Sequence, residues 1–260
     1  MEIWPTSYRE VEAGLLVLIR VSTLLFMFPF FNSRVIPVML KVGLALLITV
    51  VIFPVVDNKM IELPGASFEM LLLIAAELIM GLILGLLVQV FFEGVRMMGQ
   101  VVGFQTGFAI TNILDPQNGI QTSILSNMAF FVAMILFLLL NGHHIILSAI
   151  RESFEIVPVG SFSFKRDMFQ TLVNIYGDMF VIAIKLGAPA IAILLLTKAA
   201  FGLVVKLIPQ MNIMVVAFPV QIVIGLLFFG ISLDVLLGLV ERYLVGLRPL
   251  LTNTMKWLTV

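Results

Sequence analysis

The sequence predicts an all-α integral membrane protein made of long kinked helices and helical hairpins. Of its 260 residues, 61% are hydrophobic and only 12% are charged. The apolar residues form segments about as long as the roughly 20 residues that one bilayer crossing needs. No long polar linker separates these segments. A soluble domain of this size does not need so much apolar surface, so a bilayer or a large membrane complex must surround the chain.

Six segments are apolar enough to be read as spans. They cover residues 13–31, 36–56, 68–92, 123–150, 172–206 and 213–241. Five of the six contain formally charged residues, among them Arg20, Lys41, Glu77, Lys185, Lys198 and Asp234. The fourth segment has none, but Asn141-Gly142-His143-His144 interrupts it, and there we expect a helix to end or kink. Prolines in several of the other segments each remove a backbone hydrogen bond and predict kinks.

Charges inside apolar helices indicate that other protein surrounds them. One charge at the centre of a span costs about 2.5–3.5 kcal/mol on insertion scales. We therefore expect sheathed helices, with partner subunits supplying part of the sheath. The intramembrane charges singled out for a role are Arg20, Glu77 and Lys185. Glu77 and Lys185 could form an ion pair, Arg20 could bind backbone carbonyls at a subunit contact, and a proton relay is the alternative.

The composition and motifs exclude several classes of function. Formal net charge is zero, which gives no support to a nucleic-acid partner. Without cysteine there is no disulfide or thiolate chemistry. The hydrolase, zinc-protease and P-loop motifs are missing, so we expect neither an enzyme nor a cofactor. His143 and His144 are adjacent, so on a helix they point about 100° apart and cannot both face one metal ion.

Glycines recur every four residues in two places. Gly81 and Gly85 form one pair, and Gly99, Gly103 and Gly107 form a longer stripe. On a helix such glycines share one face and leave it without side chains. Another helix backbone can then approach closely, as membrane helices do at small residues. We expect helix packing at Gly81, Gly85, Gly99 and Gly103.

The longer stripe leads into a stretch of uncharged polar residues, which ends at Asp115-Pro116. Proline disfavours helical geometry in the residue before it, so we expect the helix to end there. Irregular backbone at membrane depth is buried in protein or lines a water-filled path. Apolar side chains beside such a path could block ions by dewetting. The predicted gate or plug residues are Phe104, Gly107, Phe108, Ile110, Asn112, Ile113, Asp115, Pro116, Gln117 and Asn118. Plain helix packing is the alternative for the glycine stripe.

Three ordered blocks of sequence carry a family resemblance. The central block is GQVVGFQTGFAITNILDP, followed by Leu-Leu-Asn-Gly-His at residues 139–143. The N-terminal block has Arg20, Pro29 and Pro37, and the C-terminal block has KLGAP, KLIPQMN and FPVQIVIG. Together they resemble the FliR/SctT family, whose members are inner-membrane subunits of the type III protein export gate. The resemblance covers residues 10–250, and Asn-Gly-His favours the flagellar branch.

The resemblance implies a function and a set of partners. Family members join FliP-like and FliQ-like subunits in a channel that passes unfolded flagellar proteins, beside FlhB-like and FlhA-like export components. It places the chain in the bacterial inner membrane, in the flagellar basal body, with much of the assembly raised out of the bilayer. It also implies a FliP-like part over residues 1–160, which holds a central plug loop, and a FliQ-like hairpin over residues 161–260.

The same resemblance places two loops. The plug loop falls around Gly107–Asn118, where the family typically has phenylalanines at the positions of Ile110 and Ile113. The tip of the FliQ-like hairpin, expected to face partners, is formed by Lys206, Pro209, Gln210, Met211 and Asn212. The alternatives are a virulence-type, SctT-like gate subunit and a small-solute or proton-coupled carrier. A carrier should show inverted internal repeats, and the two halves show none.

Overall fold

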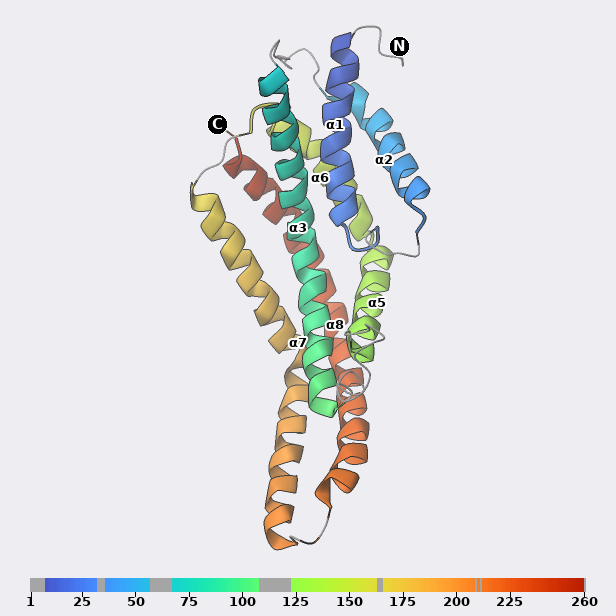
Figure 1. Ribbon diagram of the computed structural model, residues 1–260, viewed down its shortest axis with the longest axis vertical. Coiled ribbons are helices and arrows are strands. Elements are labelled where there is room, and N and C mark those ends of the chain that lie inside the picture. The colour runs from blue at the N-terminus through green and yellow to red at the C-terminus, as the bar shows by residue number, and fades with distance from the viewer. Residues whose placement is uncertain are drawn as a thin grey trace. The chain divides into compact units, whose positions relative to one another are not determined.

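The computed structural model describes residues 8–31, 36–56, 67–107, 123–162, 166–208, 210 and 212–259. Within these ranges the regular elements are helices, and strand pairing is limited to one isolated bridge between Phe162 and Thr259, which confirms the predicted all-α class (Figure 1). The elements are α1 (Tyr8–Met27), α2 (Val38–Ile52), the 3-10 turn η1 (Phe53–Val55), α3 (Ser67–Thr106), α5 (Ile124–Leu139), α6 (Gly142–Ile156), α7 (Arg166–Leu207) and α8 (Ile213–Trp257).

Four helices are long and apolar enough to cross a membrane. Their apolar stretches are Val38–Val55, Phe68–Thr106, Phe169–Leu207 and Val215–Trp257. The pair α5 and α6 gives a fifth candidate if the two are one broken span. The six spans expected from the sequence are therefore corrected to four or five. The first expected segment is not among these candidates, because any 18 consecutive residues of α1 include the three charged residues Glu10, Glu12 and Arg20.

The predicted break in the fourth segment is present. Helix α5 ends at Leu139 and α6 begins at Gly142. Between them Asn141 has a φ of 59°, in the left-handed region that asparagine tolerates better than most residues. Pro189 lies inside α7, which continues past it to Leu207.

The chain forms two compact units, and each draws on segments distant in sequence. The first consists of Met1–Val90, Asn141–Ile175 and Leu244–Val260. The second consists of Phe91–Leu140 and Tyr176–Tyr243. Helices α3, α7 and α8 contribute to both units. In the first unit α1 packs beside α2 and buries Leu16, Val17 and Val21.

The second unit has an aromatic core on α3. Phe92 is fully buried, and its ring makes edge contacts with Phe130 and Phe137 of α5. Phe91 stacks on Tyr243 of α8, with ring centroids 4.3 Å apart. Aromatic pairs at such distances add roughly 0.5–1.5 kcal/mol beyond their buried area. This core holds the second half of α3 in place.

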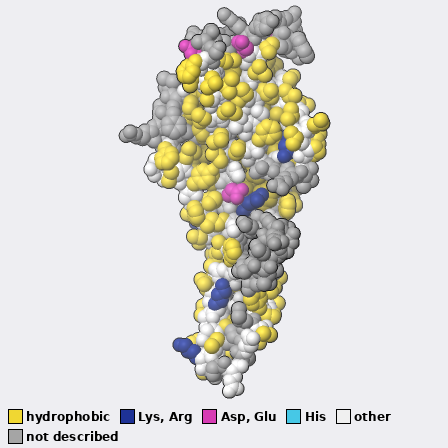
Figure 2. All heavy atoms as spheres, in the orientation of Figure 1, with side chains coloured by type: hydrophobic (Ala, Val, Ile, Leu, Met, Phe, Trp, Pro, Cys, Tyr) yellow, Lys and Arg dark blue, Asp and Glu magenta, His cyan; other side chains and the backbone are white. Residues whose placement is uncertain are grey.

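The outer surface of the helices is largely apolar. Figure 2 shows a face dominated by hydrophobic side chains, with few Lys, Arg, Asp or Glu residues among them. Large exposed apolar side chains occur along α2, α5, α7 and α8. A soluble monomer rarely exposes so much contiguous apolar surface, so lipid or other protein covers it.

Candidate functional site

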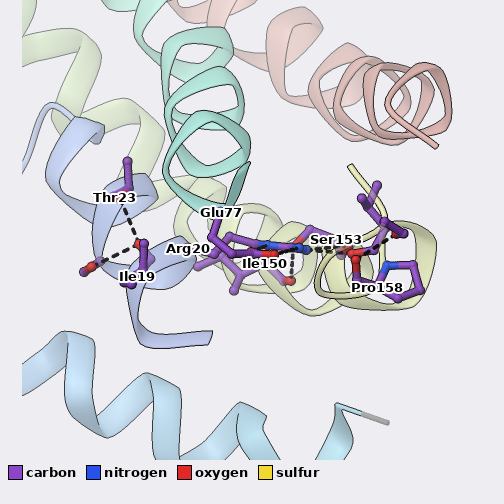
Figure 3. A network of polar contacts seen from close by, with 10 residues as sticks. Ile19, Arg20, Thr23, Glu77, Ile150, Ser153 and Pro158 are labelled. Atoms are coloured by element: carbon purple, nitrogen blue, oxygen red, sulfur yellow. Dashed lines mark hydrogen bonds and ion pairs between the residues drawn. The ribbon is translucent and has the colours of Figure 1, made fainter. Parts of the chain in front are cut away.

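The first candidate site is a buried ion pair in the first compact unit. Arg20 of α1 and Glu77 of α3 are only 2% and 1% exposed. Nε of Arg20 donates to Oε2 of Glu77 at 2.5 Å, and Nη2 donates to Oε1 at 3.0 Å (Figure 3). Both carboxylate oxygens are therefore occupied in a bidentate pair, the strongest geometry for this kind of contact.

The same guanidinium also holds the end of a third helix. Nη1 of Arg20 donates to the carbonyl oxygens of Ser153 and Val157, both at 2.9 Å. These carbonyls lie at the C-terminal end of α6, where the helix dipole is negative. The Ser153 oxygen also accepts from the backbone N–H of Val157 at 3.0 Å. The ring of Phe154 packs 4.2 Å from Cζ of Arg20. Arg20 thus ties α1, α3 and α6 together.

The partner of Glu77 differs from the one expected. The sequence suggested Lys185, but Glu77 is paired with Arg20, and Lys185 lies exposed on α7. Arg20 does bind backbone carbonyls, as expected, yet they belong to its own chain. The sequence could not give this pairing because Arg20 and Glu77 are 57 positions apart. The available signal was that an arginine in an apolar helix needs a buried acid.

Gly81 and Gly85 lie on the face of α3 that meets α1, beside the ion pair. A Cβ atom added to Gly81 would lie 2.7 Å from the backbone oxygen of Arg20. One added to Gly85 would overlap Cβ of Met27. The backbones of α1 and α3 therefore approach more closely here than a residue larger than glycine would allow, and this brings Glu77 within reach of Arg20.

The second candidate site is the C-terminal end of α3, in the second compact unit. Gly99 and Gly103 face the start of α5, where an added Cβ on Gly99 would lie 2.5 Å from Cα of Ser126. An added Cβ on Gly103 would overlap Oγ of Ser123. Ser126 also donates to the backbone oxygen of Arg96 at 2.8 Å. The face of α3 that carries Gly99 and Gly103 is therefore packed against α5 of the same chain.

Helix α8 holds the last turn of α3. Thr106 is fully buried, and an added Cβ on Gly225 of α8 would overlap its Cγ2. Gly107 has a φ of 91°, and an added Cβ there would lie 2.7 Å from the ring of Phe218. Helix α3 therefore ends at Thr106. The prediction that Asp115-Pro116 ends it is wrong, because the left-handed glycine stops the helix first.

The predicted plug residues divide between described and undescribed parts of the chain. Phe104 is 57% exposed, and Gln105 beside it accepts a hydrogen bond from Lys198 at 3.5 Å. Outside the described residues lie Phe108, Ile110, Asn112, Ile113, Asp115, Pro116, Gln117 and Asn118. At the α7–α8 connection Lys206, Gln210 and Asn212 are exposed, whereas Pro209 and Met211 are outside the described residues.

No group of three or more potential metal ligands occurs among the described residues. His143 and His144 are in contact, with ring centroids 4.4 Å apart and planes inclined by 65°. Two adjacent imidazoles do not make the three-ligand set that a metal site in a protein needs.

Comparison with known proteins assigns the family. Residues 11–246 match the family described as "Bacterial export proteins, family 1". The flagellar biosynthetic protein FliR of Bacillus subtilis strain 168 is 30% identical over 235 residues, covering 88% of this chain and 89% of that protein. FliR of Escherichia coli K12 is 30% identical over 209 residues, covering 80% and 79%. FliR of Aquifex aeolicus VF5 is 28% identical over 231 residues, covering 89% of each. The chain therefore belongs to the bacterial export proteins, family 1.

Proposed function

We propose that this chain is a structural and gating subunit of the flagellar type III protein export channel, and that it is not an enzyme. The observation that carries the proposal is the family match over residues 11–246, together with the name its relatives share. Unfolded flagellar proteins then pass through the assembled channel across the bacterial inner membrane, in the flagellar basal body. The function requires no nucleic acid, metal or organic cofactor.

The partners are FliP-like and FliQ-like subunits in the channel, and FlhB-like and FlhA-like components beside it. The exposed apolar surface of α5, α7 and α8 supports such packing, because subunits that share a channel bury surfaces of this kind. The exposed residues at the α7–α8 connection, Lys206, Gln210 and Asn212, suit a contact with the FlhB-like protein. The proposed division assigns residues 1–160 to a FliP-like part and residues 161–260 to a FliQ-like hairpin. It does not coincide with the two compact units, because each unit contains segments from both parts.

We further propose that the residues after α3 hold the channel shut. Gly107 packs against the ring of Phe218, and Ser123, just before α5, packs against Gly103. The segment between them thus starts and finishes on one packed base formed by α3, α5 and α8. The plug is Gly107–Asn118, with Ile110 and Ile113 as its apolar seal and Phe104 on the adjoining helix. A rigid base keeps such a seal in register with the passage.

The carrier alternative has less support than the export channel. A proton-coupled carrier needs a carboxylate that can take up and release a proton in the membrane. Glu77 has both oxygens bound to Arg20 and is 1% exposed, so it offers no free carboxylate oxygen to a proton path. The virulence-type alternative is disfavoured because the relatives compared above are flagellar proteins.

Deleting the gene in its own host tests the export function. We expect hook and filament proteins to disappear from the culture medium, while proteins secreted by other routes remain. A copy of the gene supplied in trans should restore them. Continued secretion of flagellar proteins from the deletion strain would contradict the proposal.

Deleting Ile110–Asn118 tests the plug. We expect membranes that contain the assembled complex to conduct ions, since the seal would be missing while α3, α5 and α8 stay packed. The control is a deletion of equal length within residues 57–66, which should leave the membrane tight. An equally tight membrane in both cases would rule out the plug.

A further inference from the structure

An apolar groove lies between α2 and α6 in the first compact unit. It has a volume of about 440 Å³. Its apolar lining consists of Leu47, Ile48, Val51, Ile52, Val55 and Leu147. Ser148 and Arg151 of α6 are the polar residues that line it. The groove is therefore apolar along α2 and becomes charged beside Arg151.

A second, smaller cavity continues the groove past Arg151. It measures about 210 Å³ and shares Ile52, Val55 and Arg151 with the groove. Glu155 and Pro158 are among its other lining residues. The two cavities adjoin at these shared residues, so the apolar groove borders a pocket that contains one positive and one negative side chain.

The two charges in the pocket lie side by side. Nε of Arg151 donates to Oε1 of Glu155 at 3.0 Å, one helical turn apart. The Arg151 side chain is 62% exposed, and its two terminal nitrogens have no hydrogen-bond acceptor among the described residues. Glu155 likewise keeps lone pairs that this single bond does not use. The pair can therefore bind one anionic and one cationic group at adjacent positions.

The groove is nearly as long as the hydrocarbon part of one lipid leaflet. The apolar stretch of α2 and η1 runs from Val38 to Val55, so Arg151, beside Ile52 and Val55, lies near one end of a candidate span. From Leu47 to Val55 the chain rises about 12 Å at 1.5 Å per residue. Half of a hydrocarbon core of about 30 Å is about 15 Å. An acyl chain along the groove would place its headgroup at the pocket.

We propose that the groove and pocket bind one zwitterionic phospholipid that carries a primary ammonium group, of the phosphatidylethanolamine type. An acyl chain lies against Val51 and its neighbours, the phosphate binds the terminal nitrogens of Arg151, and the ammonium donates to Glu155. The adjacent opposite charges match this headgroup, whereas an anionic headgroup would meet Glu155 and a choline headgroup has no N–H to donate. This inference does not depend on the export function.

Native mass spectrometry of the delipidated full-length chain tests the site. The probes are dioleoyl phosphatidylethanolamine, phosphatidylcholine and phosphatidylglycerol, each titrated separately. We expect phosphatidylethanolamine to bind tightest. Arg151→Gln should lower the affinity for phosphatidylethanolamine about tenfold, which corresponds to the loss of one charged hydrogen bond of about 1.4 kcal/mol. Glu155→Gln should lower the affinity for phosphatidylethanolamine to the affinity that the chain has for phosphatidylcholine. Arg242→Gln and Glu241→Gln, at exposed positions of α8, are the matched controls and should change nothing.

A second pair of variants tests the groove itself. Val51→Trp fills the groove and should abolish binding of all three lipids, whereas Val50→Trp, on the adjacent residue outside the groove lining, should leave it intact. Circular dichroism of each variant verifies that it is folded. Equal binding by the Val51 and Val50 variants would overturn the site, and tighter binding of phosphatidylglycerol would overturn the headgroup assignment. If Val51→Trp instead releases a FliP-like partner and leaves lipid binding unchanged, the occupant is a protein helix and the proposal is wrong.

Discussion

Replacing Glu77 by Gln removes one charge of the buried pair and keeps the shape of the side chain. Arg20 then remains charged, 2% exposed and without a counterion. Removing one partner of a buried ion pair typically destabilises a protein by about 3–5 kcal/mol. The contacts of Arg20 with Ser153 and Val157 reduce this loss, because helix-end carbonyls still face the guanidinium. We expect a loss of about 3 kcal/mol, the lower end of the range.

The double variant Arg20→Met/Glu77→Leu separates charge from packing. It leaves no unpaired charge, so the remaining loss is that of the Val157 carbonyl, since the Ser153 carbonyl keeps its bond from the N–H of Val157. A buried group left unpaired costs about 1–3 kcal/mol, and water at the helix end can take over part of that role. The double variant should therefore be no less stable than Glu77→Gln alone, although it changes two residues.

Reversible unfolding in detergent micelles measures both variants. The matched control is Glu93→Gln, because Glu93 forms a half-exposed pair with Arg96 at 3.8 Å on the same helix. Exposed pairs contribute about 0–1 kcal/mol, so this control should unfold almost like the unmodified chain. If Glu77→Gln is no more destabilising than Glu93→Gln, the role of the buried pair as a three-helix clamp is refuted.

The remaining predictions concern glycines of the helices and the exposed ring of Phe104. Gly85→Val should lower the thermal stability of the chain, because a side chain there overlaps Met27. Gly177→Ala should stabilise its helix by up to about 1 kcal/mol, because the added Cβ meets no atom within 4 Å. Thermal unfolding measures both variants. Gly107→Ala should destabilise the end of α3, since alanine disfavours a φ of 91° and its Cβ would overlap the Phe218 ring. Adding Phe218→Ala should restore part of the lost stability. No restoration would show that the ring contact is unimportant. Phe104→Ala should leave the unfolding temperature unchanged because the ring is exposed, but should raise ion leakage in the assembled complex; a tight membrane would remove this residue from the seal.

The sequence was informative wherever a local pattern decides the structure. Apolar segments of bilayer length predicted the helical class, and the Asn-Gly-His-His break correctly placed the end of one helix near residue 141. Four-residue glycine spacing identified faces of α3 on which the structure has close contacts with α1 and α5. These features depend on neighbours along the chain, which the sequence displays directly.

The sequence was uninformative wherever distant segments meet. It could not select Arg20 over Lys185 as the partner of Glu77, because both are basic residues in apolar helices and helix order in space is unknown. It also placed the end of α3 at Asp115-Pro116, since a proline is a visible stop signal. The actual stop at Gly107 depends on a backbone angle and on a ring from α8, and neither can be read from the local sequence.

Purification of the tagged full-length chain in mild detergent, with identification of whatever remains bound, tests the proposed function most directly. A subunit of the flagellar export channel should bring FliP-like and FliQ-like proteins with it, in one complex that survives size-exclusion chromatography. The contradicting result is recovery of the chain alone from cells that assemble flagella. It counts against the proposal if FliP-like and FliQ-like proteins purify together under the same conditions without the chain.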